Sequence, residues 1–310
     1  MRPLRIGTRG SALALWQANA VRDRLARASR VEAEIVVIKT SGDRFQQAPV
    51  GQIGLKGVFI KELEDALLEG RVDLAVHSMK DVPTEIPAGL AFPAICERED
   101  PRDALVTRTG AKLAELVAGA RVGTSSLRRQ SQLRHYRPDL DLRDLRGNVD
   151  TRLKKLDRGD YDAVVLAKAG LDRLGWSQRI NEVLSTDVSL PAVGQGALGI
   201  EARADDREVL DAMAGLDHAE TRDAVTAERA LLAELEGGCQ VPLGAWARLE
   251  RGELVLEACI LSADGADYIR RRAVGSPRNA EALGRELAQA MLAAGADRIL
   301  KLAGRNVGRH

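Results

Sequence analysis

The pattern of hydrophobic and polar positions predicts α/β structure that repeats in outline. Residues 5–11 (RIGTRGS) are echoed by residues 121–126 (RVGTSS): a short apolar run passes through Gly-Thr to a serine. An amphipathic segment follows each time, residues 12–25 and 127–136, so Ser11 and Ser126 are the expected helix N-caps. Where a strand leads through a tight loop into a helix, free backbone N–H groups favour an anion. The echo predicts two α/β halves of similar plan.

Two further strand-loop-helix units follow in the second half. Residues 141–145 lead through Arg146 into a helix over 149–156 that carries Arg152, and the apolar run 162–166 leads through Gly170 to Arg173. In an open parallel sheet, the loops after the strand C-termini line one crevice. We therefore expect a common cleft lined by arginines from these loops: Arg9, Arg128, Arg129, Arg146, Arg152 and Arg173. Guanidinium groups bind carboxylate or phosphate through paired hydrogen bonds, so such a cleft suits a polyanion.

The last 90 or so residues have a different pattern. Residues 221–235 read as an amphipathic helix that stops at Gly237-Gly238. Three strand candidates (243–249, 253–261 and 267–274) are separated by turn signals, and a helix is expected over 277–294. These elements predict a small α+β domain.

Composition narrows the class of protein. The chain has 310 residues, with 46 Lys and Arg against 45 Asp and Glu, and no apolar stretch long enough for a membrane span. Three cysteines without a Cys-x-x-Cys pair argue against a disulfide scaffold or a zinc site and favour the reducing cytoplasm. Positive charge is nevertheless local, because residues 121–158 hold nine Arg and two Lys against five Asp.

A Gly-x-Gly-x-x-Gly motif spans residues 194–199. A dinucleotide site requires this motif to follow a strand and open a helix. Pro191 lies just upstream and residues 200–202 do not resemble a helix start. A hinge or a close-packed crossing fits better, because glycine permits close approach of the backbone.

Two residues could carry covalent or acid–base chemistry. Cys239 lies in a loop opened by two glycines, and a thiolate there would be a strong nucleophile, although no base is near in sequence and the residue could be incidental. Cys96 and Cys259 lie in apolar runs typical of packing residues. Asp81 follows an apolar strand candidate, 72–76, and could enter the cleft or simply cap its own turn.

Seven segments in order resemble the porphobilinogen deaminase (hydroxymethylbilane synthase) family and cover nearly the whole chain. They are residues 5–18, 56–64, 77–83, 123–129, 146–153, 191–201 and 236–242. The resemblance implies a transferase of porphyrin (heme) biosynthesis. Such an enzyme joins four porphobilinogen molecules head to tail, with loss of ammonia, into the linear tetrapyrrole hydroxymethylbilane.

The resemblance also implies the site. A dipyrromethane cofactor would be thioether-linked to Cys239, and Asp81 would be the catalytic carboxylate. The acetate and propionate groups of the pyrroles would be bound by the matching polar residues: Arg9, Ser11, Lys56, Ser78, Lys80, Thr124, Ser126, Arg128, Arg129, Arg146, Arg152, Arg173 and Gln195. No metal is implied.

The fold implied is α/β, with two periplasmic-binding-protein-like doubly wound domains around a hinged cleft and a smaller C-terminal α+β domain with a three-stranded antiparallel sheet. The expected boundaries are 1–99 with 200–217, then 100–199, then 218–310. A cytoplasmic monomer without nucleic-acid or membrane partners is expected.

Two rival functions remain at this point. A solute-binding module would explain the two halves and the arginines, but it gives Cys239 and the third domain no role. A nucleic-acid binder built on residues 121–158 would show strongly salt-dependent affinity. The near-zero net charge and 3% aromatic content weigh against it.

Overall fold

The computed structural model describes residues 2–39, 60–235 and 241–307. The chain divides into two compact units, residues 1–99 with 197–222, and residues 100–196 with 223–310. Each unit is described by itself.

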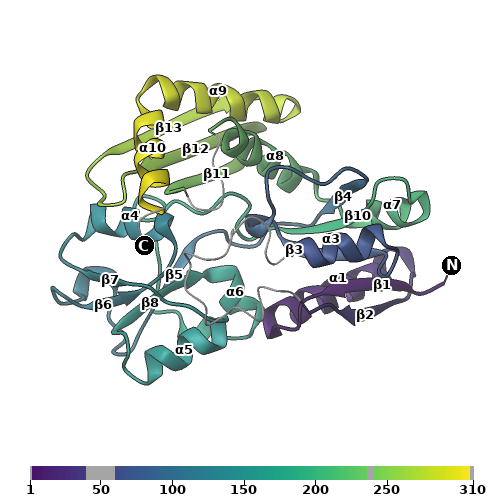
Figure 1. The fold of residues 1–310 in the computed structure, drawn as a ribbon, viewed down its shortest axis with the longest axis horizontal. Coiled ribbons are helices and arrows are strands. Elements are labelled where there is room, and N and C mark those ends of the chain that lie inside the picture. The colour runs from purple at the N-terminus through teal and green to yellow at the C-terminus, as the bar shows by residue number, and fades with distance from the viewer. Residues whose placement is uncertain (1, 40–59, 236–240, 308–310) are drawn as a thin grey trace. The chain divides into compact units, whose positions relative to one another are not determined.

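The first unit is built on a five-stranded sheet of order β2-β1-β3-β10-β4 (Figure 1). Its strands are β1 (Leu4–Thr8), β2 (Ala33–Val37), β3 (Leu74–Ser78), β4 (Leu90–Ile95) and β10 (Leu198–Arg203). β1 is parallel to β2 and β3, whereas β10 returns from a distant part of the chain and is antiparallel to β3 and β4.

Helices cover both faces of this sheet. They are α1 (Ala12–Ser29), α3 (Lys61–Leu68), α7 (Arg207–Met213) and the short 3-10 turns η2 (Met79–Asp81) and η5 (Ala214–Leu216). Leu74 and Val76 of β3 pack with α1 and α7 residues on one face, while Ala75 packs with α3 residues on the other. Because strand side chains alternate between faces, the next residues also separate, with His77 on the α3 face and Ser78 on the α1 face.

The second unit contains a sheet of the same plan, of order β7-β6-β8-β5-β9. Its strands are β5 (Asp103–Thr107), β6 (Arg121–Gly123), β7 (Asp141–Arg143), β8 (Ala163–Ala167) and β9 (Glu182–Val183). Here β5 is the antiparallel strand, paired with β8 and β9. The helices are α4 (Leu127–Tyr136), α5 (Val149–Asp157), α6 (Lys168–Arg173) and the 3-10 turns η3 (Leu113–Glu115) and η4 (Ser177–Arg179). Leu133 of α4 packs on one face, and residues of α5 and α6 pack on the other.

The rest of the second unit surrounds a three-stranded antiparallel sheet, β11-β12-β13. Its elements are α8 (Ala219–Glu234), β11 (Leu243–Glu250), β12 (Glu253–Leu261), β13 (Tyr268–Gly275), η6 (Pro277–Asn279), α9 (Ala280–Ala293) and α10 (Ala296–Val307). Leu231, Leu256 and Leu287 share one core between α8, this sheet and α9. Gly284 permits the contact of α9 with α8, because a Cβ there would overlap the carbonyl of Ala227.

The predicted fold class is confirmed: two doubly wound α/β sheets and a small α+β part around a three-stranded antiparallel sheet. The expectation of parallel sheets was wrong in one respect. Each large sheet is mixed, because one strand enters it in the opposite direction from elsewhere in the chain. The helix predicted over 277–294 corresponds to η6 and α9, but a further helix, α10, which the sequence pattern did not predict, follows Gly295, whose φ is 97°.

Candidate functional site

A pocket of about 80 Å³ lies in the first unit at the C-terminal ends of β1 and β3. These neighbouring strands are parallel, so the loops that follow them lie at one edge of the sheet. The lining includes four of the residues that the sequence singled out, Arg9, Ser11, Ser78 and Asp81. The structure therefore brings together residues separated by some seventy positions in the chain.

Local hydrogen bonds fix the walls of this pocket. Ser11 Oγ accepts a hydrogen bond from Ala14 N at 3.3 Å, which confirms the predicted N-cap of α1. The buried Gln17 of α1 donates from Nε2 to Ser78 Oγ at 3.0 Å, which ties the helix to the end of β3. Lys80 and Asp81 follow on η2, and Asp81 is exposed. An exposed carboxylate at the rim of a pocket that also holds Arg9 can meet a cationic group of a bound molecule.

The predicted residues of the second unit gather at the start of α4. Ser126 Oγ accepts a hydrogen bond from Arg129 N at 3.4 Å, so this predicted N-cap is also confirmed. The two arginines that follow are buried, and both contact Asp103 at the start of β5. Arg128 Nη1 lies 2.7 Å from Asp103 Oδ2, and Arg129 Nη2 lies 2.7 Å from Asp103 Oδ1. Sequence reasoning placed the two arginines but missed their partner.

Asp103 is the centre of a buried polar network. It also accepts hydrogen bonds from Ser189 Oγ at 2.8 Å and from Gln195 Nε2 at 2.9 Å. Burial alone would raise the pKa of Asp103, but the two guanidinium groups hold it far below its usual range. Burial in turn lowers the pKa of Arg129, although Asp103 opposes the shift. Two guanidinium groups share one carboxylate, so the start of α4 retains an excess of positive charge.

Two of the remaining predicted residues of this unit donate to backbone carbonyls. Arg152 Nε donates to Gly147 O at 2.8 Å, and the buried Arg173 donates from Nη2 to Gly196 O at 2.8 Å. Thr124 is buried beside the α4 N-terminus, where its Oγ1 accepts from Ser126 N at 3.3 Å. Arg146 lies half-buried in the loop before α5. Internal hydrogen bonds thus hold Arg128, Arg129, Arg152, Arg173 and Gln195 in fixed orientations.

The glycine motif at 194–199 allows a close approach of the backbone and does not bind a dinucleotide. It leads into strand β10 rather than a helix, which rules out the dinucleotide fingerprint. At Gly199 a Cβ would overlap the Met79 sulfur and crowd the Phe92 ring. The absent side chain therefore allows β10 to pass directly beside the η2 turn.

Lys56 and Cys239 lie outside the described residues. The other two cysteines, Cys96 and Cys259, are buried. Burial raises the pKa of the Cys259 thiol to about 11, which suits a packing role and not a nucleophile.

Three functional candidates were missed by the sequence reasoning: Gln17, Asp103 and Glu201. Gln17 is a polar residue within the apolar stripe of α1 that includes Ala18, Val21 and Leu25, and that position was a usable signal. Asp103 and Glu201 each stand in a predominantly apolar strand and are fully buried. A lone acid in such a strand marks a buried partner elsewhere in the fold.

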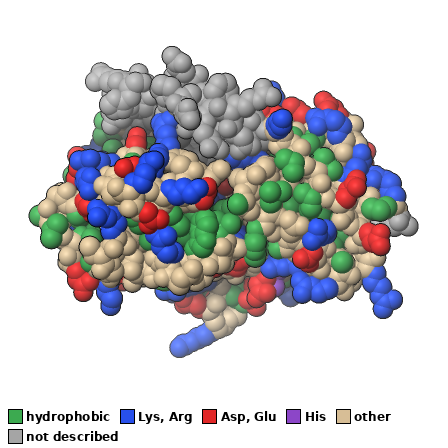
Figure 2. Space-filling model, turned by 90° about the horizontal axis from the view of Figure 1, so that it is seen from below, with side chains coloured by type: hydrophobic (Ala, Val, Ile, Leu, Met, Phe, Trp, Pro, Cys, Tyr) green, Lys and Arg blue, Asp and Glu red, His purple; other side chains and the backbone are tan. Residues whose placement is uncertain are grey.

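The surface carries charged side chains of both signs. On the face shown in Figure 2, Lys and Arg side chains are interleaved with Asp and Glu. Within residues 2–39, 60–235 and 241–307, no helix is long and apolar enough to cross a membrane. In the same ranges, no three His, Cys, Asp or Glu residues are grouped so as to hold a metal ion.

Comparisons with known proteins bear on the identity of this site. The family model described as porphobilinogen deaminase, dipyromethane cofactor binding domain, matches residues 4–211, and the model of the porphobilinogen deaminase C-terminal domain matches residues 223–293. The porphobilinogen deaminase of Pelobacter propionicus is 53% identical over 301 residues, which is 97% of each chain.

Similar solved structures include two bacterial proteins. One is an arginine-specific periplasmic binding protein from Salmonella typhimurium, with a TM-score of 0.39, 16% identity, and coverage of 70% of this chain and 92% of that one. The other is immunogenic lipoprotein A from Vibrio vulnificus, with a TM-score of 0.43, 12% identity, and coverage of 73% and 99%.

Proposed function

We propose how this chain performs the reaction of the porphobilinogen deaminases, the family to which its two domain matches and its 53% identical relative show that it belongs. The chain is a transferase of tetrapyrrole biosynthesis that polymerises porphobilinogen and contains the dipyrromethane cofactor-binding domain of that family. The proposal concerns which residues carry the reaction. The pocket that gathers Arg9, Ser11, Ser78 and Asp81 at the end of β3 is the observation that carries it.

The reaction sets clear electrostatic demands. The protonated aminomethyl group of one porphobilinogen leaves as ammonia, and the carbon left behind is a cation stabilised by its pyrrole ring. The free α-carbon of the last pyrrole in the growing chain attacks this cation, and a C–C bond forms. The attacking α-carbon then loses its proton. Ammonia and that proton together make one ammonium ion per step, so no oxidant or reductant is needed.

Asp81 fits the catalytic role in this scheme. It stands on the three-residue turn η2 and reaches the pocket, where its carboxylate can lie against the departing ammonium and the cation that follows. A fixed anion beside a developing cation lowers the barrier in proportion to how well it is held in place. The same carboxylate can accept hydrogen bonds from pyrrole N–H groups.

The substrate carboxylates require cations and hydroxyls around Asp81. In the first unit we assign this role to Arg9, Ser11, Ser78 and Lys80, and Lys56 outside the described residues belongs with them. In the second unit we assign it to Thr124, Ser126, Arg128, Arg129, Arg146, Arg152, Arg173 and Gln195. The excess positive charge at the start of α4 supports this assignment, because free N–H groups at the same helix end also favour an anion.

The donors of the second unit fit the dipyrromethane cofactor. Arg128 and Arg129 are buried and held by Asp103, so they present charge without having to be ordered when an anion binds. We assign the covalent attachment to Cys239, since Cys96 and Cys259 are buried in packing positions. When bound, the cofactor supplies the pyrrole α-carbon from which the chain is extended.

The finer organisation completes the proposal. The domains are assigned to residues 1–99 with 200–217, 100–199 and 218–310, a division that the three separate sheets support. The protein is proposed to act as a cytoplasmic monomer without nucleic acid. A net charge of +1 and three cysteines without a Cys-x-x-Cys pair support this part.

Intact mass of the denatured protein tests the assignment of Cys239. We expect the wild type to exceed its sequence mass by two linked pyrrole units and Cys239→Ser to have its sequence mass. Cys96→Ser is the matched control, and it should retain the excess. A Cys239→Ser variant that still carries two pyrrole units would refute the attachment site. A wild type that gains no mass after incubation with porphobilinogen would contradict the function itself.

A further inference from the structure

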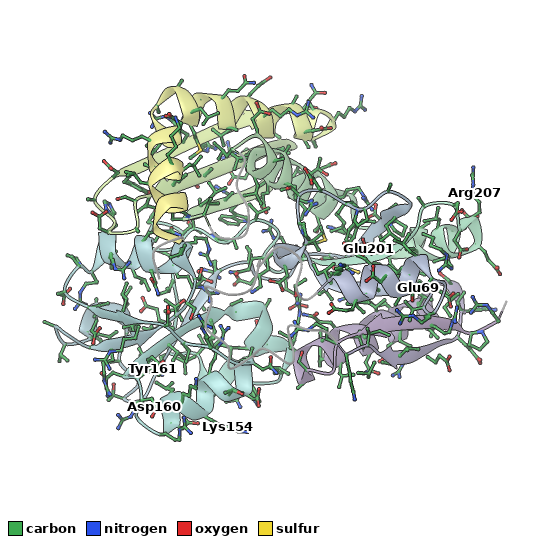
Figure 3. The ribbon with its side chains drawn as sticks, viewed as in Figure 1. Glu69, Lys154, Asp160, Tyr161, Glu201 and Arg207 are labelled. Atoms are coloured by element: carbon green, nitrogen blue, oxygen red, sulfur yellow. The ribbon has the colours of Figure 1, made fainter. Side chains whose placement is uncertain are left out.

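The first unit holds a buried pair of titratable residues that the reaction scheme above does not use. His77 of β3 and Glu201 of β10 lie on the α3 face of the sheet, with side chains 3% and 1% exposed. His77 Nε2 and Glu201 Oε2 are 2.9 Å apart. Figure 3 labels Glu201 where β10 runs beside α3.

The surroundings of this pair are poor in polar partners. Among the described residues, no aligned hydrogen bond reaches either oxygen of Glu201 or Nε2 of His77. Phe92 of β4 packs its ring edgewise against the imidazole, with ring centroids 6.0 Å apart. A buried carboxylate without hydrogen bonds is stable only beside a cation or with a proton of its own. Glu201 therefore depends on His77, whose Nε2 lies 2.9 Å away, as its partner in this apolar setting.

One more acid faces the pair from the covering helix. Glu64 of α3 is half-buried, and burial, followed by the charge of Glu201, raises the pKa of its carboxyl. His77 has the opposite, smaller effect on Glu64. These effects show that Glu64 senses the pair electrostatically, so the α3 face of the sheet holds one coupled acid–base cluster.

This cluster adjoins the turn that carries Asp81. In the strand register, Glu201 is opposite Ala75 and His77 is opposite Gly199, so the pair is a diagonal contact between β3 and β10. His77 is the last but one residue of β3, and η2 begins directly after that strand. Beyond it, Met79 N donates to Ala197 O at 3.0 Å, and Met79 fills the space that Gly199 leaves open. His77 itself lines the pocket that contains Asp81.

We propose that the His77–Glu201 pair holds the end of β3 against β10 and thereby positions Asp81 for the reaction. Both are positioning residues, and the inference rests on the proposed role of Asp81. If the charges of the pair do the holding, removing one partner disturbs the turn as much as removing both, because a lone partner has nothing to attract. Binding of substrate carboxylates by Arg9 and Ser11, which follow β1, does not depend directly on the pair.

Steady-state kinetics of Glu201→Gln, His77→Gln and the double variant provide the test, with each protein checked by intact mass for its cofactor. We expect kcat for porphobilinogen consumption to fall at least tenfold in each single variant while KM changes less than threefold. The kcat of the double variant should be no lower than that of the more impaired single variant. Such a result means strong coupling between the two residues in the double-mutant cycle. Glu34→Gln, an exposed change on β2 of the same sheet, is the control and should have wild-type kcat.

Four results would overturn the inference. Wild-type kcat in Glu201→Gln, or additive losses in the double variant, would remove the pair from the reaction. Loss of the cofactor mass in the single variants would place the pair in assembly of the holoenzyme instead. If kcat fell equally in Glu201→Gln and His77→Gln and KM fell with it in both variants, the pair would act on substrate binding instead. An inactive wild type, in contrast, would mean that the proposed function had failed and not this inference.

Discussion

The two large sheets share a plan but use their buried acids differently. In each sheet, three neighbouring parallel strands are followed by an antiparallel one. The same arginine–aspartate contacts join β1 to β3 in one sheet and β6 to β8 in the other. Arg5 and Arg121 both donate from the backbone N and from Nε to one oxygen of an aspartate, and from Nη2 to the other. Those aspartates, Asp73 and Asp162, directly precede β3 and β8. The shared scaffold is therefore built from the same local chemistry twice.

The antiparallel strands show the difference. Asp103 of β5 accepts hydrogen bonds from two arginines, a serine and a glutamine, whereas Glu201 of β10 lies beside a single histidine, His77, and the acid Glu64 is near the pair. The first arrangement fixes two cations and leaves net positive charge, which suits holding an anionic chain. The second places a buried acid–base pair next to the turn that carries Asp81. One plan thus yields a half suited to binding and a half suited to reaction.

The largest effect should come from breaking the saturated network. Asp103→Asn leaves two buried guanidinium groups without their carboxylate, so we expect a loss of about 3–5 kcal/mol in unfolding free energy, or failure to fold. Chemical denaturation measures this. Asp157→Asn, at an exposed ion pair with Arg179 in the same unit, is the control and should change little. Near-wild-type stability of Asp103→Asn would show that the arginines are not held as described.

A smaller effect should distinguish the two matching arginine–aspartate contacts. The Asp73 side chain is fully buried, whereas that of Asp162 is 36% exposed. Asp73→Asn should therefore cost about 2 kcal/mol of unfolding free energy, and Asp162→Asn should cost less because solvent screens its charge. Equal losses in thermal and chemical denaturation would contradict this difference in burial.

The same contacts predict acid sensitivity. Hydrogen bonds from Arg121 lower the pKa of Asp162 to about 2. Asp73 also has a lowered pKa, because its hydrogen bonds with Arg2 and Arg5 outweigh the effect of burial. A depressed pKa stabilises the fold above the unfolded value near 3.8, and this contribution is lost as the pH falls through the folded value. We expect stability to fall between about pH 4 and pH 2, and less steeply in Asp73→Asn. Identical acid profiles for wild type and variant would refute this assignment.

The smallest effects should come from the two helix caps. Ser11→Ala and Ser126→Ala each remove one hydrogen bond to a helix N-terminus, so each should cost about 1 kcal/mol of stability. Thermal midpoints measure both losses. Because Ser126 is assigned to the anion site at the start of α4, Ser126→Ala should also weaken retention of the cofactor carboxylates. A loss of several kcal/mol in either variant would show a role beyond capping.

Much of the fold could be predicted from the sequence because its signals are local. Ser-capped amphipathic segments located α1 and α4, and Gly-containing turns bounded the strands of the C-terminal sheet. The predicted second helix, residues 127–136, matches α4 (Leu127–Tyr136) in the structure. The antiparallel strands could not be predicted in this way, since β10 joins its sheet some 120 residues after β3. Nothing local in the sequence encodes that return.

The candidate site was predictable to a similar extent. Arg9, Ser11 and Asp81 could be placed near one another because parallel strand ends share an edge of the sheet. The partners that hold the site could not. Asp103, Gln17 and Glu201 act through contacts with distant segments, and a single acid or amide in an apolar stretch does not reveal which segment it meets.

The central claim is that Asp81 carries the reaction while the arginines hold the substrate. Its most direct test is kcat for porphobilinogen consumption by Asp81→Asn that has been shown by mass to carry its dipyrromethane. The amide has the same shape but no charge to stabilise the cation. The account predicts a loss of at least a hundredfold in kcat, as removal of one electrostatic group from an active site typically causes, with the fold and thermal midpoint unchanged. A cofactor-loaded Asp81→Asn that turns over within a fewfold of the wild type would contradict it.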